Sequence, residues 1–424
     1  MSASPAAHPQ GSVYLRVLHN RPLLWMWTGQ SISLVGDAFF NVAVMWVVYA
    51  QSGSALQTSF IQVIWHLDKI IFGPLAGLLA DQTDRKHIIV VTTAVSAVVV
   101  GALAALMVAR GQAPTAAIFA VVFLLNSLTT CGGPARAALM PDLVEPDLLA
   151  TASGVFSTVG SVASLSGGAL AGVVVATVGA AWAVAGDALS FLLAALAIAV
   201  ARLPTRTSPP PIPRGGTRLS PVGEIRAGWA VITNQPVVRA MVWLSMLINV
   251  ASFLGPLYPA LVSQRLHGSA AMLGVIEAAG VAGGIVGGAV AGPLERQVRA
   301  GPLLIIGWGV AGAGTLGLAA SVWLPLTAAL EALVVCGLTL GGVAMGALTQ
   351  ALIPENYRGR VWGLTGAVAA LSIPLSALSG GWLADRLGVA PLFAFGGVWI
   401  LGVAAVAWSN HPLRTARIAT DSTG

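Results

Sequence analysis

The sequence is dominated by long apolar runs, each bounded by charged residues, proline or glycine. A bilayer core about 30 Å thick needs roughly 20 consecutive apolar residues per helix, and many of these runs reach that length. Only 8% of the 424 residues are charged, against roughly 25% in soluble globular proteins. The chain lacks the polar residues to cover a large soluble domain, so we expect a polytopic membrane protein.

Twelve runs have the length of a membrane-spanning helix, which predicts an all-α membrane protein. Six of them precede a polar interval, at about 23–50, 56–80, 88–109, 114–138, 149–176 and 180–201. Six more follow it, at about 237–262, 270–293, 300–322, 324–350, 357–383 and 388–409. The expected organisation is an N-terminal segment (1–22), a six-helix bundle (23–201), a linker (202–236), a second six-helix bundle (237–409) and a tail (410–424).

The basic residues predict the orientation, because positively charged loops stay on the cytoplasmic side. With the N-terminus inside, 17 of the 21 Lys and Arg residues fall in cytoplasmic segments, and only Arg110, Arg265 and Arg386 fall outside. Both termini are therefore expected in the cytoplasm of a cell with this protein in its inner (plasma) membrane. The linker is basic and rich in Pro and Gly, with a short surface helix expected at 221–233.

The two predicted halves resemble each other. Gly132-Gly133 near the end of the fourth run recurs as Gly341-Gly342 near the end of the tenth, and Gly154 recurs as Gly363 at the same offset. The glycine runs at 280–292 and 307–317 predict close helix packing. Two pseudo-symmetric six-helix bundles joined by a long linker are one of the internal symmetries from which transporters are built.

The most specific local motif is Gly77-Leu-Leu-Ala-Asp81-Gln-Thr-Asp84-Arg85-Lys86, after the second run. It resembles the G-x-L-x-D-R-x-G-R-R/K signature of the major facilitator superfamily, with Asp84 and Gln82 as departures. The resemblance implies a conformational latch in which Asp81 and Arg85 form a charge pair and Gly77 allows close helix approach. The residues assigned to this latch are Gly77, Asp81, Asp84, Arg85, Lys86 and Arg136, the last with lipid phosphate as its alternative partner.

Further stretches resemble the macrolide-efflux and enterobactin-exporter branch of that superfamily. They are Trp27-Thr-Gly-Gln30 with Ser33-Leu-Val-Gly36-Asp37, Gly133-Pro134-Ala-Arg136 with Pro141-Asp142, and Asp187-Ala-Leu-Ser-Phe191. The resemblance runs from about residue 16 to residue 410 and implies the major facilitator fold. It also implies a central cavity, a rocking motion of two bundles and a proton gradient as the driving force.

Charged side chains inside the runs are the candidates for proton coupling or substrate binding, because each costs at least about 2.5–3.5 kcal/mol at the bilayer centre. Asp37 lies near the middle of the first run, and Glu277 and Glu331 lie in the eighth and tenth. For each, a structural hydrogen bond is the alternative role. Asp68 is expected to neutralise Lys69 or pair with another helix. The polar candidates within the runs are Asn126 and Asn249.

Asp187, near the start of the sixth run, is expected to cap or pair at the outer interface. Four tryptophans near run ends, Trp25, Trp27, Trp182 and Trp323, are expected in interfacial belts. Cys131 and Cys336 are expected to be free thiols.

Several functional classes find no support in the residues. No Walker motif G-x-x-x-x-G-K-[ST] occurs, so we expect no direct use of ATP. No metal-ligand spacing or nucleophile motif occurs either, so we expect no metal, no cofactor and no enzyme activity. The basic residues form no stripe with interleaved aromatics, which argues against nucleic acid as a partner.

We therefore expect a monomer in the lipid bilayer that exports an amphipathic small molecule, such as a drug, a macrolide-like compound or a siderophore, in exchange for protons. The alternatives are a proton-coupled importer of a nutrient and a transporter-like sensor that binds without translocating.

Overall fold

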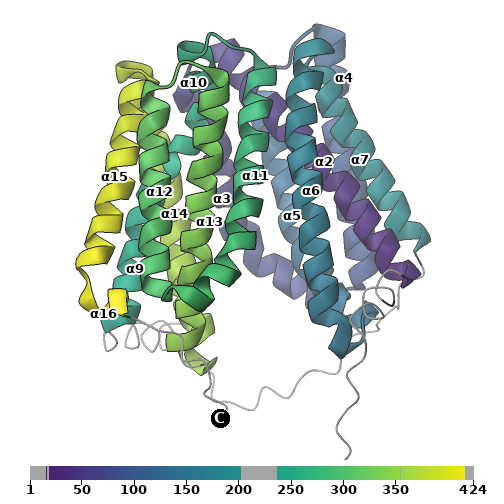
Figure 1. Ribbon diagram of the computed structural model, residues 1–424. Coiled ribbons are helices and arrows are strands. Elements are labelled where there is room, and N and C mark those ends of the chain that lie inside the picture. Colours follow the sequence, from purple (N-terminus) through teal and green to yellow (C-terminus); the bar gives the residue numbers. More distant parts are fainter. Residues whose placement is uncertain (1–15, 17–18, 202–235, 354, 416–424) are drawn as a thin grey trace, which may run out of the picture. The chain divides into compact units, whose positions relative to one another are not determined.

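The computed structural model describes residues 16, 19–201, 236–353 and 355–415, and their regular secondary structure is helical (Figure 1). The first part of the chain forms α2 (Arg21–Ser52), α3 (Ala55–Gln82), α4 (Arg85–Arg110), α5 (Thr115–Leu143), the 3-10 turn η1 (Pro146–Leu148), α6 (Leu149–Thr177) and α7 (Ala180–Val200). The second part forms α9 (Pro236–Asn249), η2 (Val250–Leu257), α10 (Tyr258–Arg265), α11 (Ala270–Gln297), α12 (Ala300–Ala320), α13 (Leu324–Leu352), α14 (Glu355–Leu387), α15 (Val389–Ser409) and α16 (His411–Thr415). Each predicted run corresponds to one helix, except for the seventh.

The seventh run, predicted as one helix over 237–262, is broken into α9, η2 and α10. Pro256 lies inside η2 and lacks the backbone N–H that a regular helix needs. Ser376 of α14 stabilises the break, because its hydroxyl donates to the Val250 carbonyl at 2.5 Å and accepts from the Phe253 N–H at 3.2 Å. A neighbouring helix thus satisfies backbone groups that lipid cannot.

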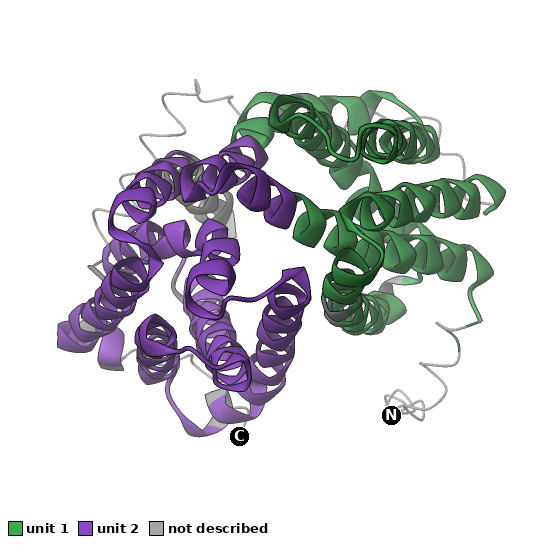
Figure 2. Ribbon diagram, turned by 90° about the horizontal axis from the view of Figure 1, so that it is seen from above, with its two compact units in different colours: residues 1–44, 67–212 green, residues 45–66, 213–424 purple. Residues whose placement is uncertain are grey.

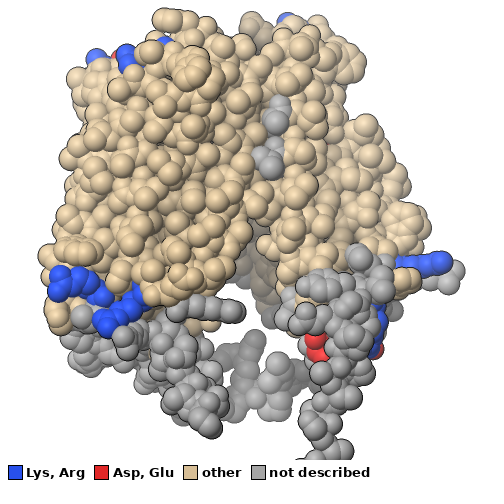
Figure 3. All heavy atoms as spheres, in the orientation of Figure 1, with Lys and Arg blue, Asp and Glu red and all other residues tan. Residues whose placement is uncertain are grey.

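The helices have the length and surface of membrane spans. Ten stretches of described helix are long and apolar enough to cross a membrane, with Val238–Arg265 counted as one. The other two predicted spans, α3 and α14, have 28 and 33 residues and are not among these ten. Large apolar side chains such as Val98 and Leu375 point outward, 71% and 68% exposed. On the face shown in Figure 3, described charged side chains lie near the helix ends, and the wall between is uncharged.

The chain divides into two compact units (Figure 2). Unit 1 comprises residues 1–44 and 67–212, and unit 2 comprises residues 45–66 and 213–424. The C-terminal end of α2 and the start of α3 therefore group with the second half of the sequence. α3 begins in unit 2 and ends in unit 1.

The paired glycines predicted to be repeats occupy matching environments in the two units. A Cβ on Gly132 of α5 would lie 2.9 Å from Thr92 Oγ1 of α4, and one on Gly341 of α13 would lie 2.5 Å from the ring of Trp308 of α12. Neither Gly133 nor Gly342 has such a neighbour within 4 Å. The first glycine of each pair therefore packs two helices together, while the second lines a pocket in its own unit.

Two expectations about interfacial residues were wrong. Trp27 is buried at 4% exposure and stacks on Phe156, whereas Trp25, Trp182 and Trp323 are exposed as expected. Asp187 is fully buried rather than interfacial. The basic linker with its expected surface helix, the N-terminal segment up to residue 15 and the tail from residue 416 lie outside the described residues.

Candidate functional site

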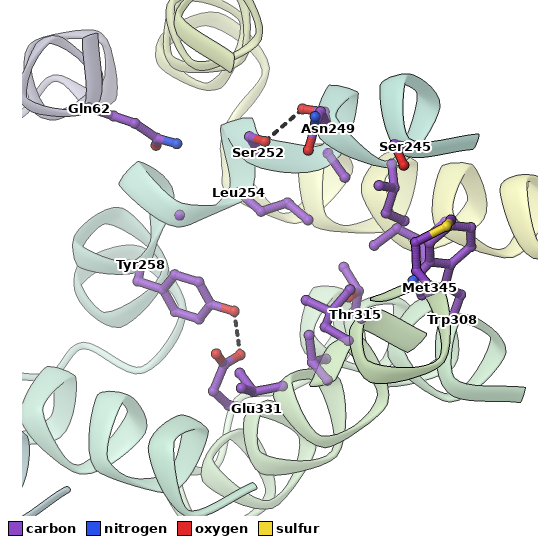
Figure 4. Close-up of a pocket in the computed structure, with 18 of the residues that line it drawn as sticks. Gln62, Ser245, Asn249, Ser252, Leu254, Tyr258, Trp308, Thr315, Glu331 and Met345 are labelled. Atoms are coloured by element: carbon purple, nitrogen blue, oxygen red, sulfur yellow. Dashed lines mark hydrogen bonds between the residues drawn. The ribbon is translucent and has the colours of Figure 1, made fainter. Parts of the chain in front are cut away.

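A pocket of about 570 Å³ lies within unit 2 (Figure 4). This volume is in the range of about 300–1,000 Å³ that small-molecule sites occupy. Aliphatic and aromatic side chains form most of its wall, and Glu331 alone among the lining residues carries a charge. The lining residues discussed below are Gln62, Asn249, Tyr258, Trp308, Glu331 and Gly342.

The carboxylate of Glu331 is fixed at one end of this pocket by a tyrosine. Tyr258, the first residue of α10, donates its hydroxyl proton to Glu331 Oε2, as the dashed line in Figure 4 shows. The ring of Tyr258 is in turn held edge-on against Phe393, with centroids 5.5 Å apart. Glu331 is only 8% exposed. A carboxylate that is shielded from water binds a cation more strongly than one in bulk water.

α11 packs against α13 next to this glutamate. A Cβ on Gly280 would lie 3.2 Å from Glu331 Oε1, and one on Gly287 would lie 2.6 Å from the Cys336 carbonyl oxygen. A Cβ on Gly283 would overlap the Ala332 carbonyl oxygen. The glycine run predicted to give close packing therefore brings α11 against the backbone of α13 at Ala332 and Cys336, which follow Glu331 in the chain.

The other two candidates of this half lie in the same region. Glu277, one turn before Gly280, is half-buried and interacts electrostatically with Glu331 and Tyr258, but it does not line the pocket. Asn249 lines it at the end of α9, and its carbonyl oxygen accepts a hydrogen bond from Ser252 at 2.6 Å. The break between α9 and α10 thus supplies polar groups to an otherwise apolar pocket.

Unit 1 contains a separate group of charges around Asp37. Asp37 lies in the middle of α2, is half-buried, and interacts electrostatically with Arg136 of α5 and Asp187 of α7. Arg136 lines a smaller cavity of about 270 Å³ together with Met26, Gln30 and Phe156. Arg136, assigned from the sequence to the latch, therefore lies beside the proton-coupling candidate of the same unit.

Asp68 is held by α5 rather than by its neighbour Lys69. Its two carboxylate oxygens accept hydrogen bonds of 2.6 Å from Ser127 and Thr130, and it is fully buried. Lys69 is exposed. Asn126 of the same helix donates to the Val122 carbonyl oxygen one turn earlier, at 2.8 Å. These contacts give Asp68 a partner on another helix.

Residues at the end of the Gly77–Lys86 motif contact the ends of three helices, α4, α5 and α7. Asp84 caps α4 by accepting from the His87 N–H at 2.9 Å, and Arg85 forms an ion pair with Asp142 at 2.5 Å. Lys86 donates to the carbonyls of residues 199 and 201 at the end of α7. The described acidic partner of Arg85 is thus Asp142; the side chain of Asp81 lies outside the description. A Cβ on Gly77 would meet nothing within 4 Å, so the close approach expected there is absent from the described contacts.

Among the charged contacts that sequence reasoning missed is one in which Asp385, near the end of α14, caps the start of α3 within unit 2. Asp385 accepts from the Ala55 N–H at 2.6 Å, from the Leu56 N–H at 3.3 Å and from the Ser54 hydroxyl at 2.6 Å. These N–H groups belong to the first turn of α3 and have no partner within their own helix. The only sequence signal was an acidic residue near a predicted loop, which is common.

We predict that Asp385→Ala makes the amides of residues 55 and 56 exchange with deuterated water about five- to thirtyfold faster. Loss of a helix cap costs about 1–2 kcal/mol, which corresponds to that range. Hydrogen–deuterium exchange with mass spectrometry checks this. Asp385→Asn keeps an acceptor oxygen but loses the charge, so its exchange rate should fall between those of the wild type and Asp385→Ala. Unchanged exchange in Asp385→Ala would show that the cap does not hold the helix end.

Comparison with known proteins decides the family. Residues 26–377 match the sequence pattern of the Major Facilitator Superfamily. The chain is a member of this superfamily. The predicted fold class is thereby confirmed, as is the expectation that the protein is a transporter and not an enzyme.

Two curated relatives within the superfamily span almost the whole chain. Macrolide efflux protein A of Streptococcus pyogenes is 25% identical over 396 residues, which cover 90% of this chain and 94% of that protein. Multidrug efflux pump Tap of Mycolicibacterium fortuitum is 26% identical over 387 residues, which cover 88% and 91%. The resemblance to the macrolide-efflux branch is therefore confirmed.

Solved structures agree with the assignment to the Major Facilitator Superfamily. A bacterial homologue of the iron transporter ferroportin, in an inward-facing state, matches with a TM-score of 0.71 at 16% identity and covers 92% of this chain and 98% of its own. An auto-inhibited POT family peptide transporter matches with a TM-score of 0.69 at 15% identity, covering 95% and 99%. At these identities the two structures show a shared fold alone.

Proposed function

We propose that this transporter exports an amphipathic, cationic small molecule across the plasma membrane by alternating access, in exchange for protons. The observation that carries the proposal is the pocket of unit 2, where a single shielded carboxylate, Glu331, lies in a largely apolar wall. Apolar surface binds the body of a lipophilic compound, and the carboxylate binds its positive charge. The drug-efflux function named for both curated relatives supports the export direction.

Two carboxyl sites suit an exchange of a cation for a proton. Glu331 lies at the pocket of unit 2, and Asp37 lies beside Arg136 in unit 1. Burial favours the neutral form of a carboxyl, so each group can take up a proton when its positive partner leaves. We further propose two six-helix bundles over 23–201 and 237–409, with both termini in the cytoplasm, on the basis of the distribution of Lys and Arg.

The first test is accumulation of ethidium and erythromycin in efflux-deficient bacteria that express the protein. We expect lower accumulation than in cells without it, and we expect both a protonophore and Asp37→Asn to abolish the difference. Asp147→Asn, which removes an exposed carboxylate of unit 1, is the matched control and should export normally. No change for either compound would contradict the multidrug proposal and favour an importer or a sensor.

A further inference from the structure

The environment of Asp187 is unusual for an acid in the interior of a membrane protein. Asp187 is the eighth residue of α7, about 12 Å of helix from its start, and it is fully buried. Its Oδ1 accepts from the Ser190 hydroxyl at 3.2 Å, but that hydroxyl also donates to the Asp187 carbonyl at 2.8 Å. Its Oδ2 is buried without a hydrogen-bond partner among the described residues. An ionised carboxylate in such a place has a large desolvation cost.

α2 packs against this carboxyl as closely as a glycine allows. A Cβ on Gly36 would overlap Ser190 Oγ and would lie 2.5 Å from Asp187 Oδ1. Gly186 on the other side of the acid packs against the ring of Phe39, where a Cβ would lie 3.2 Å from the ring. The residue after Gly36 is Asp37. The sequence pair Gly-Asp thus occurs on both helices at their contact, and its two acids interact electrostatically.

The charges around this pair do not balance when both acids are ionised. Asp37 interacts with Arg136 and with Asp187, so two acids face one base. The other helices packed against α7 are α4 and α6. α6 contains no ionisable residue, and those of α4 are confined to its ends at 85–87 and 110. Two neighbouring carboxyls with one compensating charge favour the state in which they share a single proton.

We propose that Asp187 is the second carboxyl of a one-proton site with Asp37, and that the shared proton is the one exchanged during transport. This inference rests on the proposed proton coupling. Asp37 is half-buried and borders the region of Arg136, whereas Asp187 is fully buried. Protons therefore enter and leave through Asp37, and Asp187 retains the proton away from water. Arg136 stabilises Asp37 in its ionised form when the proton lies on Asp187.

The test uses purified protein in liposomes with ethidium as the transported probe. We expect Asp187→Asn to abolish ethidium transport driven by a pH gradient, while ethidium–ethidium exchange, which needs no net proton movement, is retained. Asp147→Asn is the matched control and should behave as wild type in both assays. Gradient-driven transport by Asp187→Asn with the wild-type rate and pH profile would overturn the proposal.

Infrared difference spectra between acidic and alkaline buffer test the shared proton without a transport assay. Only a protonated carboxyl shows the carboxylic acid C=O band. We expect one such component in the wild type. Asp37→Asn and Asp187→Asn should each shift the pH at which it appears, because the remaining acid then titrates alone, and the double variant should lack it. Two separate components, or a spectrum unchanged by Asp187→Asn, would overturn the proposal. Should Asp187→Asn fail to fold, Asp37→Asn against wild type still decides, because Asp187 then titrates alone and its component must move.

If wild-type transport does not depend on the pH gradient, the proposed proton coupling is contradicted, but the carboxyl pair is not. The infrared measurement keeps the two failures distinguishable.

Discussion

Glu331→Gln is expected to raise the KM for ethidium export about ten- to a hundredfold, since a charge-assisted contact contributes about 1.5–3 kcal/mol. The substitution keeps the size of the side chain and an acceptor for the Tyr258 hydroxyl, so the pocket should keep its shape. Initial rates of ethidium efflux over a range of concentrations measure the effect. The KM for a neutral amphipathic compound that the wild type transports should rise much less.

The comparison variant is Glu277→Gln, which removes a carboxyl on the neighbouring helix that does not line the pocket. It should change the KM for ethidium far less than Glu331→Gln does. Equal losses for the cationic and the neutral compound in Glu331→Gln would contradict a direct contact with the positive charge. That outcome would leave Glu331 with a role in proton uptake alone.

Gly283→Ala is expected to have the largest effect on stability. The added methyl group would overlap the Ala332 carbonyl oxygen, which belongs to the backbone of α13 and cannot rotate away. α11 and α13 must then separate, and the contacts next to Glu331 loosen. Overpacking of this kind costs about 1–3 kcal/mol or more. We expect a markedly lower melting temperature in detergent and weaker ethidium export.

Gly292→Ala, in the same helix, is the matched control. A Cβ there would meet nothing within 4 Å, and alanine is the better helix former by roughly 1 kcal/mol. This variant should melt at the wild-type temperature or slightly above. Similar destabilisation of both variants would mean that the loss of stability is not caused by the contact of Gly283 with α13.

Much of the fold follows from the sequence, because the length of an apolar run fixes one membrane span. The broken seventh span was missed, since Pro256 lies within a run that is apolar throughout and its compensation by Ser376 depends on another helix. Pairings between distant residues were also hidden. Tyr258 and Glu331 are 73 positions apart, and nothing in their local sequence indicates that one binds the other.

The sequence indicated which residues belong to the candidate sites, but it did not indicate the direction in which each side chain points. The cost of burying charge selected Glu331, which is buried, and Asp37, which is half-buried. Position along a helix, however, does not tell which face a side chain occupies. Asp187 was therefore assigned to the outer interface and Arg136 to the latch. The helix faces on which they lie, on α7 and α5, place both residues beside Asp37.

The cap on α3 adds a free-energy cost to any step of the transport cycle that separates the start of α3 from α14. Its three donors converge on one carboxylate, Asp385, whose helix lies more than 300 residues later in the chain. Because these hydrogen bonds share one carboxylate, they are lost together, whereas an extended apolar contact is lost gradually. A motion that draws the start of α3 away from α14 must therefore break this cap together with the close packing of Gly381 against Ala55 and Leu56.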